Sequence, residues 1–124
     1  MLFRITQFFA LLLLPSLLIG AQETVQSMNV NAQLISAAKR IQLDLLVRAL
    51  NAGGSPNSRN RAGDTALNLA ARNGNVAMVQ LLLSAGGDVN KANLEKVTPL
   101  MSAAFQGHAA VVTLLLEKDR KSVV

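Results

Sequence analysis

The chain has 124 residues, 51% of them apolar, and its formal net charge is +5. This length suits one domain and is too short for two domains of full size. Because the chain contains no Cys and a single His, it cannot form disulfide scaffolds, thiol nucleophiles, cysteine-ligated metal centres or His-based metal clusters. The apolar content also argues against a wholly disordered tail.

The first 21 residues show the three regions of a secretory signal peptide. Arg4 supplies a basic start, residues 8–19 form an apolar core, and the small residue Ala21 precedes a polar stretch. This core is short compared with the ~20 residues that a helix needs to cross a bilayer. We therefore expect a signal peptide over residues 1–21, followed by a polar linker over residues 22–30. The alternative is that the signal segment stays in place as a membrane anchor.

The rest of the chain repeats with a period of 33 residues. Two copies share Thr65 with Thr98, Leu67 with Leu100, Ala70 and Ala71 with Ala103 and Ala104, Gly74 with Gly107, Val79 with Val112, and residues 81–83 with residues 114–116. A weaker copy lies one period earlier and includes Leu34, Ala37 and Ala38. Three copies in one register predict a solenoid in which each unit stacks on the next. The expected repeat domain spans residues 31–124, with repeats at about 31–59, 60–92 and 93–121.

The residues within each copy predict two helices. Thr65 and Thr98 can cap a helix by accepting a hydrogen bond from a free backbone amide, and Pro99 is tolerated just inside that start. Gly74 and Gly107 suit a left-handed residue at the end of this first helix. Apolar residues then recur at the three-to-four spacing of a second, buried helix. Each unit therefore reads as turn, short helix, turn, longer helix, which predicts an all-α fold.

This pattern resembles the ankyrin repeat. Residues 63–67 (GDTAL) and 97–100 (VTPL) look like its G-x-T-P-L start, and residues 70–75 (AARNGN) and 103–108 (AAFQGH) look like its A-A-x-x-G-H segment. The resemblance covers about residues 31–120. It implies an all-α ankyrin-repeat solenoid of helix-turn-helix units joined by short hairpin-like turns.

The sequence departs from the family pattern at several positions. Asn68 and Met101 stand where the family has His after T-P-L, so the hydrogen bonds of that His must be made differently or lost. Ile41 stands where the first copy should have its helix-ending Gly, and Arg48 stands where the second copy has Leu81. Arg48 suits a terminal unit whose outer face meets water.

The third copy keeps the apolar face of an internal repeat, although solenoids normally close with a polar capping unit. This face comprises Ala110, Val111, Val112, Leu114 and Leu115. Four explanations remain open. A cap has been lost by truncation of the gene, the face is closed by self-association, a partner covers it, or a small exposed patch is tolerated.

No pattern in the sequence predicts an enzyme. The family resemblance gives His108 a structural role at its G-H position, and the carboxylates are scattered rather than paired for general acid–base catalysis. Gly53-Gly54 and Gly86-Gly87 end helices at the repeat period, and no P-loop lysine follows them. We therefore expect no catalytic residue, no cofactor and no metal.

A binding role is the better prediction. The family resemblance places the ligand surface on the concave side, which is formed by the turn tips and the first helix of each repeat. Carried over by position, this surface comprises Lys39, Arg40, Arg61, Ala62, Asp64, Arg72, Asn73, Leu94, Glu95, Val97, Phe105 and Gln106. Its N-terminal half is basic and its C-terminal half is more apolar. Phe105 is the only aromatic residue after the signal segment, so it is either a binding hot spot or a contact for a neighbouring repeat.

The positive charge favours an acidic protein partner, with anionic lipid and ordinary solvated charges as alternatives. Nucleic acid is not expected, because stacking aromatic residues are absent. We predict an exported protein-binding module, periplasmic or secreted. The lack of Cys and of Asn-x-Ser/Thr sites favours a bacterial periplasm. The alternative is a membrane-anchored structural or accessory subunit that retains residues 1–21.

Overall fold

The computed structural model describes residues 29–122, which form six helices and no strand. The helices span residues 29–40, Leu43–Asn51 (α3), Ala66–Asn73 (α4), Val76–Ser84 (α5), Pro99–Phe105 (α6) and Ala109–Ser122 (α7). The predicted signal peptide over residues 1–21 lies outside the described residues. Residues 29 and 30, which the sequence places at the end of the linker, are helical.

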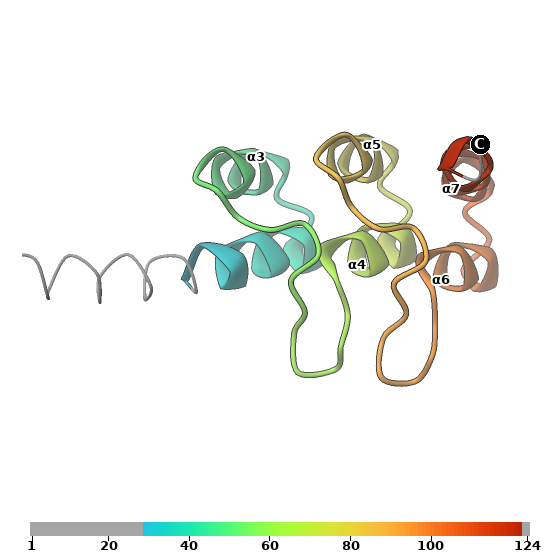
Figure 1. Cartoon of the computed structure of the whole chain (residues 1–124), viewed down its shortest axis with the longest axis horizontal. Helices are drawn as coiled ribbons and strands as arrows, with labels where there is room; N and C mark the ends of the chain where they lie inside the picture. The colour runs from blue at the N-terminus through green and yellow to red at the C-terminus, as the bar shows by residue number, and fades with distance from the viewer. Residues whose placement is uncertain (1–28, 123–124) are drawn as a thin grey trace, which may run out of the picture.

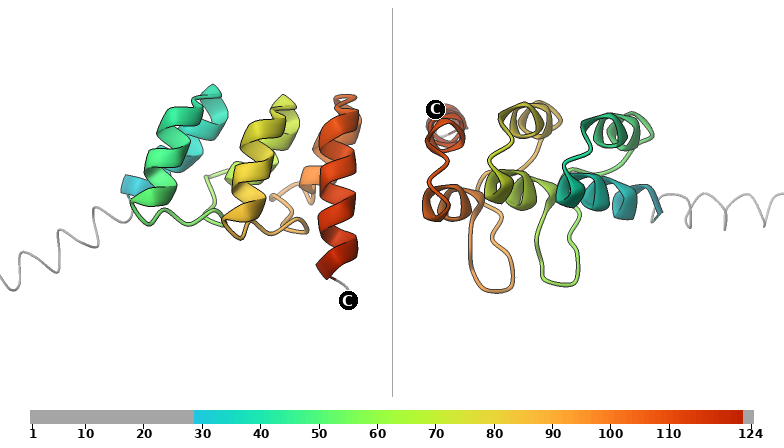
Figure 2. Two further views of the ribbon diagram at one scale, coloured as in Figure 1. Left: turned by 90° about the horizontal axis from the view of Figure 1, so that it is seen from above. Right: turned by 180° about the vertical axis from the view of Figure 1, so that it is seen from behind.

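The six helices form three pairs that stand side by side (Figure 1). The first helices of the repeats (29–40, α4 and α6) make one layer, and the second helices (α3, α5 and α7) make the other. Within this stack α4 packs on α6, and α5 packs on both α3 and α7. Two hairpin-like loops project to the same side of the first layer. Figure 2 shows the second helices side by side with roughly parallel axes. The predicted all-α solenoid is confirmed.

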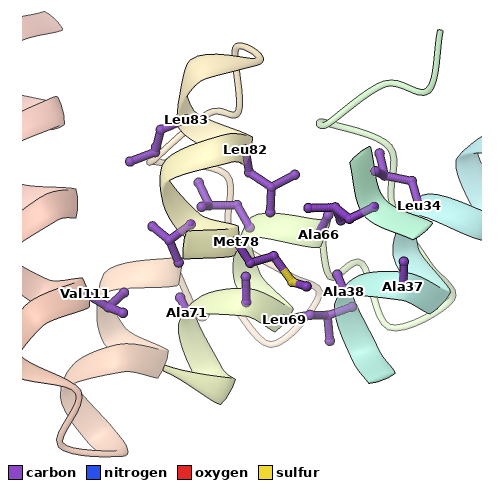
Figure 3. Packing of buried hydrophobic residues seen from close by; sticks show 14 of the residues in the cluster. Leu34, Ala37, Ala38, Ala66, Leu69, Ala71, Met78, Leu82, Leu83 and Val111 are labelled. Carbon is purple, nitrogen blue, oxygen red and sulfur yellow. The ribbon is translucent and has the colours of Figure 1, made fainter. Parts of the chain in front are cut away.

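The core runs continuously through the stack between the two layers (Figure 3). Alanines on the first helices, such as Ala38 and Ala71, are fully buried and let neighbouring helices approach closely. Leu34, Met78 and Leu82 fill the space between the layers and are likewise inaccessible to solvent. Each fully buried side chain of this size contributes about 1.5–3 kcal/mol. The packing of the repeats against one another therefore stabilises the fold more than the formation of any single helix does.

The helix caps follow the sequence prediction. The hydroxyl oxygens of Thr65 and Thr98 each accept a hydrogen bond from the backbone amide three residues later, at 3.2 Å in both cases. Gly74 and Gly107 adopt left-handed conformations, with φ of 72° and 77°. The backbone amides that follow them bond back to Ala70 and Ala103, so each first helix ends in the same closed turn.

The first repeat makes the same turn with Ile41 in place of glycine. Ile41 has a φ of 57°, and the amide of Gln42 donates to the carbonyl of Ala37 at 2.9 Å. This bond matches those made to Ala70 and Ala103 in the other repeats. A left-handed conformation costs a residue with a Cβ about 1–2 kcal/mol, and a β-branched side chain makes it less favourable still. The geometry of the repeat therefore overrides the preference of Ile41.

Replacing Ile41 with glycine is expected to raise the free energy of unfolding by about 1 kcal/mol. Glycine removes the strain at this φ, and because Ile41 is half exposed, the burial that is lost offsets only part of this gain. Urea unfolding followed by far-ultraviolet circular dichroism measures the change. Ile41→Ala is the matched control, because alanine keeps the Cβ and with it most of the strain. A glycine variant no more stable than the alanine variant would contradict the assignment of strain.

The two departures after the T-P-L motif have different outcomes. Asn68 is fully buried, and its Nδ2 donates to the backbone carbonyl of Lys91 in the following loop at 3.1 Å. Asparagine thus ties the first helix of its repeat to the loop that leads into the next repeat, at the position where the family has His. Met101 follows one period later and is 55% exposed. The described residues contain no further loop for it to contact.

The last repeat buries only part of its apolar face. Val111 and Leu115 are buried against the second repeat, whereas Val112 and Leu114 are half-buried. Leu116 is 50% exposed, although Leu83 at the equivalent position of the second repeat is buried. None of the helices in this part of the chain combines the length and apolarity that a membrane crossing requires.

Candidate functional site

The first helices and the hairpin loops enclose one face of the solenoid, which we call the concave face (Figure 1). Residues at the C-terminal end of each first helix lie on this face, near the loops of the same and the next repeat. Two grooves lie along it, one toward each end of the stack. They contain most of the residues that the sequence analysis selected.

The N-terminal groove is basic and encloses about 990 Å³. Its lining comprises Asn31, Ala32, Ile35, Ser36, Lys39, Arg40, Ser58, Arg59, Asn60 and Arg61. Lys39 and Arg40 lie at the end of the helix over residues 29–40, and the two arginines come from the first hairpin. All four cations are exposed, and no carboxylate is among the lining residues. This groove therefore attracts anionic groups.

The C-terminal groove is smaller, about 620 Å³, and mixes apolar and charged side chains. Its lining comprises Ala62, Asp64, Arg72, Asn93, Glu95, Val97, Met101, Ser102, Phe105 and Gln106. Phe105 is 88% exposed and Met101 is 55% exposed, so one wall offers apolar surface to solvent. An exposed aromatic ring in a groove is typical of a binding hot spot.

Asp64 lies at the centre of a hydrogen-bond network beneath the C-terminal groove. Its carboxylate is almost fully buried and accepts from Arg72 Nη2 at 3.2 Å and from Asn93 Nδ2 at 2.9 Å. Arg72 belongs to α4, whereas Asn93 belongs to the next hairpin. The carboxylate therefore joins two repeats and neutralises the charge of Arg72, so that Arg72 is a paired cation rather than a free one.

Asparagine side chains hold the tips of both hairpins. Oδ1 of Asn60 accepts from the amides of Ala62 and Asp64, both at 2.9 Å. Oδ1 of Asn93 does the same for Glu95 and Val97 one period later, at 2.9 and 3.0 Å. Such side-chain turns fix the backbone locally. Because the backbone of each tip is fixed, the side chains of the two tips lie at defined positions along the concave face.

The repeat geometry agrees with a comparison against known families. The family model for ankyrin repeats in three copies matches residues 34–123, which is most of the chain. The chain belongs to the ankyrin-repeat family. Ankyrin-repeat proteins are generally interaction modules without catalytic activity, and the three repeats identify this chain as a protein–protein interaction module. A comparison with curated proteins finds no match.

Two further residues of the ankyrin repeats cap the first helix of the preceding repeat. Asn73 Nδ2 donates to the carbonyl of Ala38 at 3.2 Å, and His108 Nε2 lies 3.0 Å from the carbonyl of Arg72. Because a carbonyl only accepts, Nε2 of His108 carries the hydrogen in this contact. His108 thus makes the structural contact expected for the G-H position. Its ring also fills the space where a side chain on Gly74 would lie.

The structure places most of the sequence-selected residues of the ankyrin domain in the two grooves. Lys39, Arg40 and Arg61 line the N-terminal groove, whereas Ala62, Asp64, Arg72, Glu95, Val97, Phe105 and Gln106 line the C-terminal groove. Asn73 and Leu94 line neither groove. Leu94 lies at the second hairpin tip, 73% exposed, and its amide donates to Ala62 of the first hairpin at 3.1 Å.

Sequence reasoning missed three residues of the C-terminal groove: Asn93, Met101 and the buried Ser102. Asn93 and Met101 carried a signal in the repeat period, because they are the counterparts of Asn60 and Asn68 in the preceding repeat. Asn60 and Asn93 recur as turn-forming residues, and that recurrence predicts a shared structural role. Nothing in the period alone indicates that Asn93 also binds Asp64.

Proposed function

We propose that this chain is an exported protein-binding module that engages its partner through the concave face. The observation that carries the proposal is the exposure of Phe105 in a groove where Asp64 bonds both Arg72 and Asn93 and so links two repeats. A preorganised groove binds at a lower entropic cost than a flexible one. The exposed cations of the neighbouring groove add long-range attraction for a partner of negative charge.

Site-specific photocrosslinking tests the location of the binding face. A photoreactive residue at Gln106 lies in the C-terminal groove, whereas one at Gln80 lies on the second-helix side. Both positions are exposed, so the two probes are matched in accessibility. We expect a protein adduct from position 106 in extracts of the native compartment and none from position 80. Adducts formed only from position 80 would overturn the concave-face proposal.

Replacing Phe105 with alanine is expected to weaken partner binding at least tenfold, about 1.4 kcal/mol or more. Stability should change by less than about 0.5 kcal/mol, because the ring is almost fully exposed and few contacts are lost. Capture of the crosslinked partner and urea unfolding measure the two effects. Leu116→Ala is the matched control, since it removes exposed apolar surface from α7 outside both grooves. Equal losses of capture in the two variants would argue against a specific role for Phe105.

Export is the second part of the proposal and rests on residues 1–21 alone. Arg4, the apolar core at residues 8–19 and Ala21 support a cleaved signal peptide. The mass of the protein purified from its native compartment tests this. A mass reduced by that of residues 1–21 supports export and cleavage. An intact N-terminus in the membrane fraction supports the alternative, an anchored accessory subunit.

A further inference from the structure

The two grooves of the concave face differ in charge. Lys39, Arg40, Arg59 and Arg61 are the charged residues that line the N-terminal groove, whereas Asp64, Arg72 and Glu95 line the C-terminal groove. Because Asp64 neutralises Arg72, the carboxylate of Glu95 sets the sign of the second groove. A carboxylate of a ligand is therefore attracted to the first groove and repelled by the second.

The cations of the first groove belong to two opposing segments. Lys39 and Arg40 end the helix over residues 29–40, and Arg59 and Arg61 stand on the hairpin across from them. Arg59 is held in place, because its Nη1 donates to the carbonyl of Ala92 in the next hairpin at 2.9 Å. A narrow anionic segment lying in the groove thus meets cations from both sides.

The apolar surface lies in the second groove. Met101 and Phe105 are exposed on α6, and Val97 is half-buried beside them. Covering these apolar side chains lowers the free energy of binding only when the ligand contacts them with apolar groups of its own. A purely anionic ligand would leave this wall of the groove exposed to water. The two grooves together therefore suit a ligand that carries both acidic and apolar side chains.

A flat anionic surface fits this arrangement poorly. Both hairpins project to the same side, so a membrane surface would meet their tips first (Figure 1). The first tip carries Arg61, whereas Glu95 and Lys96 at the second tip cancel in charge. The remaining cations of the first groove lie away from the tip, on the first helix and on the arm of the hairpin. A protein segment that enters the groove reaches all of them.

We propose that the concave face recognises a protein segment in which acidic residues adjoin an apolar side chain. The carboxylates lie against Lys39 and Arg40 in the N-terminal groove, and the apolar side chain packs on Phe105 in the C-terminal groove. This inference rests on the proposed function, because it assigns chemistry to the partner of the same face. It also sets the order of the partner along the stack, with its acidic part toward the first repeat.

Fluorescence anisotropy of labelled synthetic peptides tests this proposal on the full chain. One peptide joins a glutamate run to a leucine-rich half through a short glycine linker, and two others carry each half alone. We expect the joined peptide to bind at least about tenfold more tightly than either half, because the second contact becomes intramolecular. Part of this binding should survive ~0.3 M salt, at which exposed charges are strongly screened. Joined and acidic peptides of equal affinity would overturn the two-groove proposal.

Charge reversal assigns the acidic half to its groove. Lys39→Glu combined with Arg40→Glu should weaken binding of the joined peptide at least about tenfold and leave the leucine-rich half unaffected. Arg120→Glu combined with Lys121→Glu is the matched control, because it makes the same change of net charge at exposed positions on α7. Lys39→Gln with Arg40→Gln, which removes the charges without reversing them, should give a smaller loss. Circular dichroism verifies that each variant is folded. Equal losses in the two charge-reversal variants would overturn the assignment.

Two outcomes separate this inference from the proposed function and from a lipid ligand. If the adduct from position 106 persists but charge reversal at Lys39 and Arg40 changes neither peptide binding nor capture, the proposed function stands and the inference fails. Vesicles of phosphatidylserine and phosphatidylcholine are the competing probe. Vesicle binding that falls with the same charge reversal, together with no binding of the joined peptide, would replace the protein segment with an anionic lipid.

Discussion

Replacing Gly63 with alanine is expected to lower the free energy of unfolding by about 3 kcal/mol. Gly63 has a φ of 79°, which is unfavourable for any residue with a Cβ. An added Cβ would lie 2.8 Å from the backbone nitrogen of Leu94, and this atom belongs to the amide that bonds the second hairpin to the first. Because the obstacle is backbone, a side-chain rotation cannot relieve it.

Lys96 provides a matched control within the same molecule. It occupies the equivalent position one period later with a φ of 63°, so its backbone has the same left-handed conformation. Lys96 is exposed at the second hairpin tip. Lys96→Ala should therefore change stability by less than about 0.5 kcal/mol. Urea unfolding followed by circular dichroism suits both variants, because the chain contains no Trp. A loss below about 1 kcal/mol for Gly63→Ala would show that the hairpins are not locked together as the structure describes.

Replacing Asp64 with alanine is expected to lower the free energy of unfolding by about 2–3 kcal/mol. The carboxylate is almost fully buried, and its removal leaves Arg72 and the amide of Asn93 without their acceptor. Arg72 is 40% exposed, so water replaces part of its lost interaction. For this reason the expected loss is smaller than for a completely buried ion pair.

Asp44→Ala is the comparison for this second variant. Asp44 is exposed in the first turn of α3, where a carboxylate stabilises a helix by about 0.3–1 kcal/mol. Both variants remove one negative charge, so the difference between their unfolding free energies isolates the network around Asp64. Similar losses in the two variants would mean that the network contributes little. Arg72→Glu is unsuited as a test of binding, because a second carboxylate beside Asp64 would perturb the fold itself.

The sequence predicted the helix starts and ends that depend on residues close together in the chain. Thr65 and Thr98 cap helices through bonds to amides three residues away, and Gly74 and Gly107 end them in a conformation that glycine favours. Such interactions depend on residues close together in the chain. The 33-residue period then predicted how the units stack, because each unit buries its apolar side only against a neighbour.

The sequence predicted where the candidate residues lie, but it did not predict which of their charges are paired. Lys39, Arg40 and Phe105 lie on the concave face, as the family resemblance implies, and they are exposed. Asp64 and Arg72 lie there too, yet they bind each other and a loop of the next repeat. No local pattern distinguishes a free charge from a paired one, because pairing depends on side-chain directions across neighbouring repeats.

By itself, the sequence determined an all-α solenoid of three ankyrin repeats and the residues that begin and end its helices. The tertiary structure decided which of its polar residues hold the repeats together and which face solvent. Asn68 pairs with Lys91, Asp64 pairs with Asn93, and Ile41 takes a glycine conformation. The Asp64–Asn93 pair spans adjacent repeats, and the Asn68–Lys91 pair joins a helix to the loop that leads into the next repeat. The backbone of Ile41 follows the closed turn that all three repeats share. Stacking brings residues about one period apart into contact, so its geometry, rather than local preference, sets these interactions.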